Sequence, residues 1–101
     1  MNMPLTLSDL EDRALAMCEA EFVEFSMAAD ILQQWFDRAI SVAELREVFE
    51  RLAELGLIEC RVGDSWSFTN VVPNAPLIEK ASFRATSTGE TYLNGTHRKV
   101  T

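Results

Sequence analysis

The side chains best suited to chemistry in this sequence are three carboxylates, Glu44, Glu47 and Glu50, which follow one another at helical spacing. Two carboxylates act as general acid and base when at least one of them lies in a cleft that shifts its pKa. Here the spacing directs all three toward the solvent side of one predicted helix, and nothing in the sequence indicates a cleft. We interpret them as a solvated acidic face rather than a catalytic pair.

Other nucleophiles and metal ligands are sparse. His97 is the only histidine and stands in a polar stretch, so no serine or threonine has a histidine placed to activate it. Cys18 and Cys60 do not form a Cys-x-x-Cys motif, and no second histidine completes a zinc site. We expect both cysteines to be small buried hydrophobes in a reducing compartment rather than a disulfide. Gly-x-Gly-x-x-Gly and phosphate loops are also absent from the sequence. The sequence therefore predicts no enzyme activity, no cofactor, no metal and no small-molecule substrate.

Charge is unevenly distributed along the 101 residues, whose formal net charge is −7. Residues 1–55 carry −8 and residues 56–101 carry +1. The first half of the chain would therefore repel a phosphate backbone. Hydrophobic residues make up 48% of the chain, which suffices for one core and argues against disorder. No apolar run is long enough to cross a bilayer and no secretory signal opens the chain, so we expect a cytoplasmic protein without a membrane partner.

Three helices are predicted in the first half. Ser8 with Glu11, and Ser41 with Glu44, have the spacing of a capping box, so a helix begins after each serine. The first helix should reach Glu19 or Ala20. The stretch 21–25 alternates polar and apolar residues and is either a short strand or an extended connection.

The second helix is predicted to begin after Ser26, with a turn over residues 37–40 before the third. Its apolar face consists of Ala28, Ile31, Leu32, Trp35 and Phe36. The inner face of the third helix consists of Val42, Leu45, Val48, Phe49, Leu52 and Leu55. Gly56 supplies the left-handed residue that ends this helix. Glu47 and Arg51 have the spacing of an ion pair on its surface.

After Gly56 the pattern becomes that of strands. Residues 57–69 are predicted to form a β-hairpin, with a turn at Gly63, Asp64 and Ser65. A loop follows over residues 70–76, then a third strand over residues 80–85. Thr86 caps a short last helix that runs through Leu93. We expect one domain over residues 1–94 and a flexible C-terminal tail over residues 95–101.

Two segments of the sequence resemble parts of the winged helix-turn-helix family of transcription regulators. Residues 41–58, SVAELREVFERLAELGLI, resemble the third helix of these proteins running into the first strand of the wing. Residues 83–93, FRATSTGETYL, resemble the strand that leads into their Thr-x-x-Gly turn and helix. The resemblance covers roughly residues 5–94. It implies an α+β fold, a small winged-helix domain in which a three-helix bundle is followed by a β-hairpin wing, a closing strand and a short C-terminal helix.

The charges depart from those of the DNA-binding members of this family. In such members the third helix enters the major groove with Arg, Lys, Asn, Gln, Ser or Thr on its outer face. Here that face presents four acids and two bases: Glu44, Glu47, Glu50, Glu54, Arg46 and Arg51. The hairpin carries Glu59, Arg61 and Asp64 and offers no net attraction. Positive charge elsewhere comes from Lys80, Arg84, Arg98 and Lys99.

The tryptophans are the remaining candidates for a contact surface. Trp35 and Phe36 are adjacent, so one of them fills the core and the other lies partly exposed, as edge packing or as an anchor in a protein interface. Trp66 either braces the wing against the core or makes a contact of its own. The loop NVVPNAPL over residues 70–77 is a linker or a docking segment.

These observations predict a non-catalytic, winged-helix module that mediates protein–protein interaction in a regulatory role, with a protein partner or a second copy of the chain. The candidate interaction surface comprises Glu44, Arg46, Glu47, Glu50, Arg51, Trp35, Trp66 and Arg84. The alternative is a dimeric DNA-binding transcription regulator, which the charges disfavour and which would depend on Arg46, Arg51 or Arg84.

Overall fold

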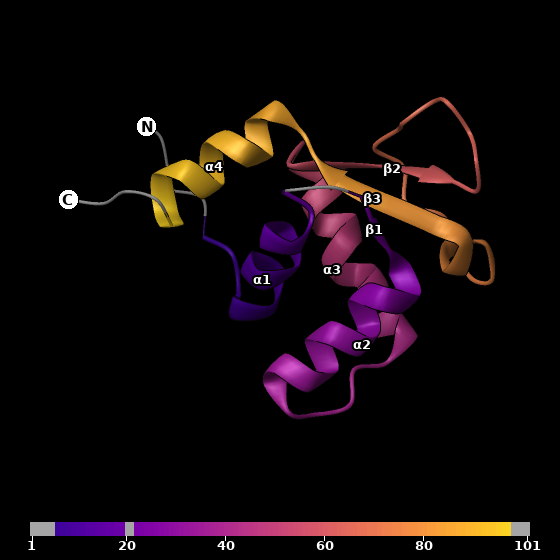
Figure 1. Ribbon diagram of the computed structural model, residues 1–101, viewed down its shortest axis with the longest axis horizontal. Coiled ribbons are helices and arrows are strands. Elements are labelled where there is room, and N and C mark those ends of the chain that lie inside the picture. The colour runs from indigo at the N-terminus through magenta and orange to yellow at the C-terminus, as the bar shows by residue number, and fades with distance from the viewer. Residues whose placement is uncertain (1–5, 20–21, 98–101) are drawn as a thin grey trace.

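The computed structural model describes residues 6–19 and 22–97 of the chain. Over these residues the chain forms an α+β fold of four α-helices, one short 3-10 helix and a three-stranded antiparallel sheet, compatible with a small winged-helix domain (Figure 1). The elements follow in the order α1 (Asp9–Met17), β1 (Val23–Glu24), α2 (Phe25–Phe36), α3 (Val42–Glu54), β2 (Ile58–Val62), η1 (Leu77–Lys80), β3 (Ala81–Ala85) and α4 (Ser87–His97).

The predicted capping box opens α1. The Glu11 amide donates to Ser8 Oγ at 3.1 Å, and the Ser8 amide donates to Glu11 Oε1 at 2.9 Å. The helix ends earlier than the predicted end at about Glu19 or Ala20, and Ala20 lies outside the described residues. The helix ends at Met17 because the Cys18 amide turns back to the carbonyl of Leu15, which tightens the last turn.

The start of α2 also differs from the prediction. Residues 23–24 form a strand, as one of the two open alternatives had it, and the chain passes from that strand directly into the helix. The predicted cap at Ser26 is therefore wrong. Glu24 is the N-cap and makes no side-chain cap bond, and it stands in register with Ser82 of β3. The turn after α2 begins with Asp37 in the left-handed conformation, at φ 53°.

The two ends of α3 are set by the predicted residues. Ser41 Oγ accepts from the Glu44 amide at 3.0 Å, and Gly56 takes φ 77° just after the helix. The capping box is only half formed, because the carboxylate of Glu44 binds another residue. The predicted inner face is buried at Leu45, Val48, Phe49 and Leu52 and exposed at its two ends, Val42 and Leu55.

The sheet has the strand order β1-β3-β2, so the long pairing is between β2 and β3, with Ile58 opposite Ala85. The predicted hairpin over residues 57–69 is therefore wrong in its second strand. Thr69 meets β2 only through a single bridge to Cys60. The Ser65 hydroxyl accepts from the Ser67 amide at 3.2 Å, and this local turn competes with a strand ladder.

Three phenylalanines form the centre of the core, between α2, α3 and the sheet. The rings of Phe49 and Phe83 stack with centroids 4.2 Å apart. The ring of Phe25 lies tilted against both, at 6.1 Å and 6.4 Å. These contacts join a helix, a second helix and the middle strand, so the core fixes the relative placement of α2 and α3.

The start of α4 is docked on the turn that follows α3. Thr86 donates from its hydroxyl to the Gly56 carbonyl at 2.6 Å, and its amide donates to the Leu57 carbonyl at 2.9 Å. The same hydroxyl accepts from the Gly89 amide at 3.1 Å and so caps the helix as predicted. The helix runs to His97, past the predicted end at Leu93, so residues 95–97 of the predicted tail are helical. Residues 98–101 lie outside the described part of the chain.

Candidate functional site

The guanidinium of Arg46 on the outer face of α3 is occupied by its own chain. Its Nε donates to the Pro73 carbonyl at 2.9 Å and its Nη2 to the Val72 carbonyl at 3.1 Å. Nη1 also forms an ion pair with Glu50 Oε1 at 3.3 Å, one helical turn along α3. Arg46 thereby ties the loop over residues 70–76 to the helix. Its donors point at backbone carbonyls rather than at solvent.

Arg51 binds groups of α1 and of the segment before it. Its Nε lies 3.1 Å from Glu11 Oε2 on α1, and its Nη2 donates to the Thr6 carbonyl at 3.4 Å. The predicted pair between Glu47 and Arg51 is therefore wrong. The side chain of Glu11 is only 15% exposed, so its carboxylate attracts a cation more strongly than the fully solvated Glu47 does.

Arg38 joins the turn before α3 to the first turn of that helix. Its Nη2 lies 2.7 Å from Glu44 Oε2 and its Nη1 3.1 Å from Oε1, a two-pronged contact. The hydrogen bonds from Arg38 hold the pKa of Glu44 below its ordinary value of 4.5 and raise the pKa of Arg38. No sequence pattern singles out Arg38, because it lies in a turn whose path depends on α2 and α3 together.

The acids that remain unoccupied on this face are Glu47 and Glu54. Both are exposed, and within the described part of the chain neither is matched with a cation. Glu44 and Glu50 are instead matched with Arg38 and Arg46. The outer face of α3 therefore presents engaged cations and free carboxylates.

Arg84 lies on the far side of the fold from α3, on the outer face of the sheet. Its Nε is 2.5 Å from Glu59 Oε2 in β2, and its guanidinium lies 3.5 Å from the ring centroid of Phe68. The Phe68 ring stacks on that of Phe22 at 5.2 Å, and Arg61 lies 4.6 Å over Phe22. Sequence reasoning missed this cluster. Its only sequence signal was the alternation that puts Glu59 and Arg61 on one side of β2.

The tryptophans lie apart from these residues and from each other. Trp66 is 95% exposed in the loop after β2, so it does not brace the wing. Trp35, near the end of α2, is 59% exposed, while its neighbour Phe36 packs against the core. The guanidinium of Arg13 lies 3.6 Å from the centroid of the indole. The candidate residues therefore occupy four separate places: α3, α2, the loop after β2, and β3.

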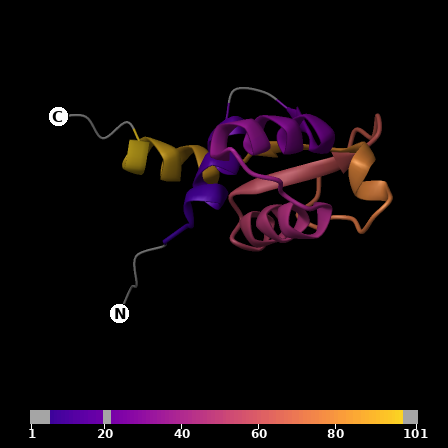
Figure 2. The ribbon, with the colours of Figure 1, turned by 90° about the horizontal axis from the view of Figure 1, so that it is seen from below.

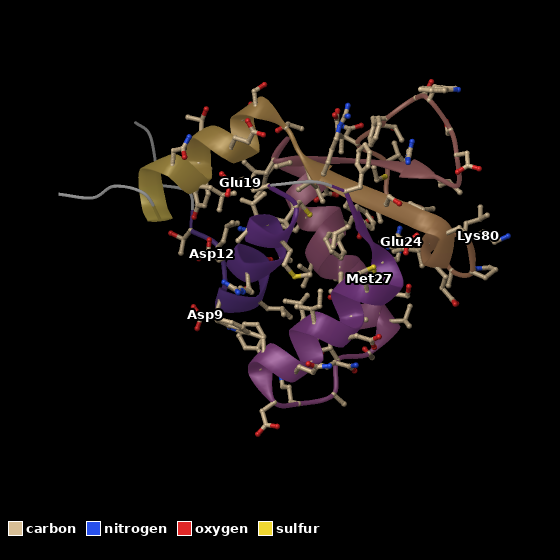
Figure 3. All side chains as sticks on the ribbon, viewed as in Figure 1. Asp9, Asp12, Glu19, Glu24, Met27 and Lys80 are labelled. Carbon is tan, nitrogen blue, oxygen red and sulfur yellow. The ribbon has the colours of Figure 1, made fainter. Side chains whose placement is uncertain are left out.

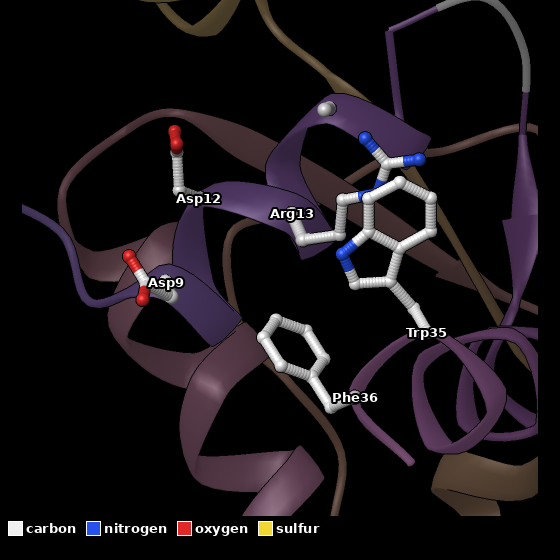
Figure 4. Close-up of a pocket in the computed structure, with 6 residues that line it drawn as sticks. Asp9, Asp12, Arg13, Trp35 and Phe36 are labelled. Atoms are coloured by element: carbon white, nitrogen blue, oxygen red, sulfur yellow. The ribbon is translucent and has the colours of Figure 1, made fainter.

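A cleft of about 280 Å³ opens between α1 and α2 beside Trp35 (Figure 4). Its walls are the indole and the Phe36 ring from α2, and Arg13, Asp9, Asp12 and Ala16 from α1. Arg13 covers one face of the indole and leaves the rest of Trp35 accessible. The cleft is open at the surface, and the aromatic rings of Trp35 and Phe36 form part of its lining.

The outward side of α2 carries further apolar side chains. Met27 is 52% exposed and Ile31 is 40% exposed, at four-residue spacing with Trp35. We call these three residues the α2 stripe. Of the predicted apolar face of this helix, Ala28 and Leu32 are buried, whereas Ile31 and Trp35 lie on the stripe.

Residues able to do covalent or metal chemistry are not gathered in the described part of the chain. Cys18 and Cys60 are buried free thiols, as expected. Burial raises the pKa of Cys18 to about 12, and burial together with Glu59 raises that of Cys60. Over residues 6–19 and 22–97 no three His, Cys, Asp or Glu side chains are grouped as a metal site. His97 is the last residue of α4. No helix in these ranges is long and apolar enough to span a membrane.

Comparison of the chain with protein-family models, with curated proteins and with solved structures gives no match.

Proposed function

We propose that this chain is a non-catalytic, winged-helix module that acts through protein–protein contacts in a regulatory role. The observation that carries the proposal is that the arginines around α3 are already bound within the chain. Arg38, Arg46 and Arg51, which surround the outer face of α3, all bind carboxylates or carbonyls of their own chain. A helix that reads DNA needs such groups free for phosphates and base edges.

Electrostatics adds to this argument. To contact a phosphate, Arg46 would have to release the loop at Val72 and Pro73, and Arg51 would have to leave Glu11. Each release would also expose a carboxylate or a carbonyl toward the phosphates. Glu47 and Glu54 already face outward there. A partner protein with basic and apolar side chains faces neither cost.

The proposal is tested by titrating a labelled random-sequence DNA duplex with the purified chain, at about 50 mM and about 200 mM salt. We expect no saturable binding at either salt concentration. Tight binding that weakens steeply with salt would overturn the proposal and favour the alternative, a dimeric DNA-binding regulator.

A charge variant tests whether the acidic outer face of α3 is the reason that DNA does not bind. Exchanging Glu47→Lys together with Glu54→Lys removes the two unpaired carboxylates and leaves every ion pair of α3 intact. We expect this variant to gain weak, salt-sensitive DNA binding. The matched control, Glu79→Lys with Glu90→Lys, makes the same change in net charge at exposed positions away from α3. An equal gain in the control would show that net charge, and not this face, governs the approach of DNA.

A further inference from the structure

We infer that a groove between α1 and α3 binds a basic, amphipathic helix of a partner protein, with Lys or Arg at two positions seven residues apart. The inference rests on the proposed function and deepens it, since it names the kind of segment that a protein-interaction module would take. The contact lies on α3, on the opposite side of the fold from α2 (Figure 2).

The groove, of about 530 Å³, lies between the start of α1 and the outer face of α3. Its wall on α3 extends from Glu44 to Glu54, which is about 15 Å of helix. Leu10 of α1, which is partly buried, and Val48 of α3 form its apolar lining. A groove of this length accommodates about three turns of a second helix, with apolar side chains against the lining and polar side chains at the rim.

The charges of the groove favour a basic occupant. Four of the six charged side chains in its lining cancel in two ion pairs, Arg38 with Glu44 and Arg51 with Glu11. The two that remain are Glu47 and Glu54, which are exposed and have no cation beside them in the described part of the chain. The groove therefore has a net charge of −2, and its two arginines are already neutralised.

The spacing of the two free carboxylates fits a helix. Glu47 and Glu54 are seven residues apart, so they lie two turns apart on the same flank of α3, about 10 Å along its axis. In paired helices, charges that recur every seven residues beside the apolar seam select the partner. A partner helix lying along α3 presents its own residues i and i+7 at the same interval. A Lys or Arg at each of these positions therefore reaches one carboxylate, while apolar side chains between them cover Leu10 and Val48.

Other acids near the groove have the same sign. Asp9 and Asp12 of α1 point away from the body of the fold (Figure 3). Residues 1–55 carry a formal charge of −8, whereas residues 56–101 carry +1. Charges within a Debye length, about 10 Å at moderate salt, add to the attraction of a basic segment. The helical half of the chain therefore draws such a segment toward the groove.

Fluorescence anisotropy with a designed peptide tests the inference. The probe is an amphipathic helix of about 18 residues, built from alanine, glutamine and leucine, with two lysines seven residues apart beside its leucine face. We expect saturable binding of the labelled probe to the full chain at about 50 mM salt, and weaker binding at about 200 mM. A second peptide of the same composition, with its lysines opposite the leucines, should bind at least about fivefold more weakly.

Two matched variants locate the contact. Glu47→Gln together with Glu54→Gln removes both unpaired carboxylates of the groove and should raise the dissociation constant of the probe at least about fivefold. Glu79→Gln with Glu90→Gln makes the same change in net charge at exposed positions away from α3, and should leave the constant unchanged. Circular dichroism verifies that both variants are folded.

A charge exchange across the groove should restore binding. A peptide with glutamate in place of both lysines should not bind the parent chain, and should bind the chain that carries Glu47→Lys and Glu54→Lys. The inference is overturned if the lysine probe does not bind, if the two peptides or the two variants behave alike, or if the exchanged pair fails to bind. The DNA titration is independent of these results. Tight DNA binding overturns the proposed function, whereas failure of the probe alone removes only the groove as the place of contact.

Discussion

The six arginines in the described part of the chain all contact groups of their own chain. Arg38, Arg46, Arg51 and Arg84 bind carboxylates, Arg61 reaches the Ser65 carbonyl, and Arg13 covers Trp35. Exposed ion pairs of this kind contribute little to stability, typically about 0–1 kcal/mol each. They also affect recognition, because a donor bound within the chain must first be released before it can contact a phosphate.

The pair between Arg38 and Glu44 makes a pH-dependent prediction. The pKa of Glu44 is lower in the folded chain than its ordinary 4.5, so the pair stabilises the fold above that pH. The contribution disappears as the pH falls through the lowered pKa. Glu44→Gln should therefore reduce the thermal midpoint at neutral pH and match the parent in acid. Glu47→Gln, an unpaired carboxylate on the same helix, should show no such deficit. An equal deficit at both pH values would contradict the role assigned to the pair.

The turn after α3 and the start of α4 act as one joint. Thr86 bonds to the carbonyls of both Gly56 and Leu57, and Gly89 lies directly against the Leu57 carbonyl, where a Cβ would overlap the oxygen. The two sequence segments that resemble winged-helix regulators, residues 41–58 and 83–93, thus supply the two sides of one contact. Gly89 is needed here for its small size, not for an unusual backbone angle.

Gly89→Ala should destabilise the fold through this joint. The overlap with the Leu57 carbonyl should cost about 1–3 kcal/mol, against a gain of at most about 1 kcal/mol from better helix propensity. Urea unfolding followed by circular dichroism measures the difference. Thr88→Ala, at the neighbouring exposed position of α4, is the control and should stay close to the parent. A Gly89→Ala chain as stable as the parent would mean that α4 is not held against Leu57.

Local signals explain which elements could be predicted from the sequence. Ser8, Ser41, Gly56 and Thr86 act within a few residues of themselves, and each sets a helix end as expected. The predicted start of α2 and the predicted second strand of the hairpin were wrong, because pairing with β3, distant in sequence, decides how β1 and β2 are placed.

The candidate site residues also divide into those that local spacing places and those that only tertiary contacts place. Helical spacing sufficed to place Glu47 and Glu54 on an outer face. Arg46 binds the carbonyls of Val72 and Pro73, which lie 26 and 27 residues further along the chain. Helical spacing could not predict these partners. For α2, spacing located an apolar face, and only tertiary packing shows that Ile31 and Trp35 lie outside the core.

The molecule as a whole has two unlike sides. One side is the outer face of α3, with free carboxylates and engaged arginines. The other is α2, which lies on the opposite side of the fold (Figure 2). Between Phe25 and Phe36 it carries one charged residue, Asp30, and it exposes Met27, Ile31 and Trp35.

The nuclear magnetic resonance spectrum of the chain, recorded during titration with a random-sequence DNA duplex at about 50 mM salt, tests this account most directly, because it reports whether the outer face of α3 contacts DNA. We predict that the amides of Arg46, Glu47 and Arg51 do not shift, because both arginines are bound within the chain and Glu47 repels phosphates. Saturable shifts at these amides would contradict the account.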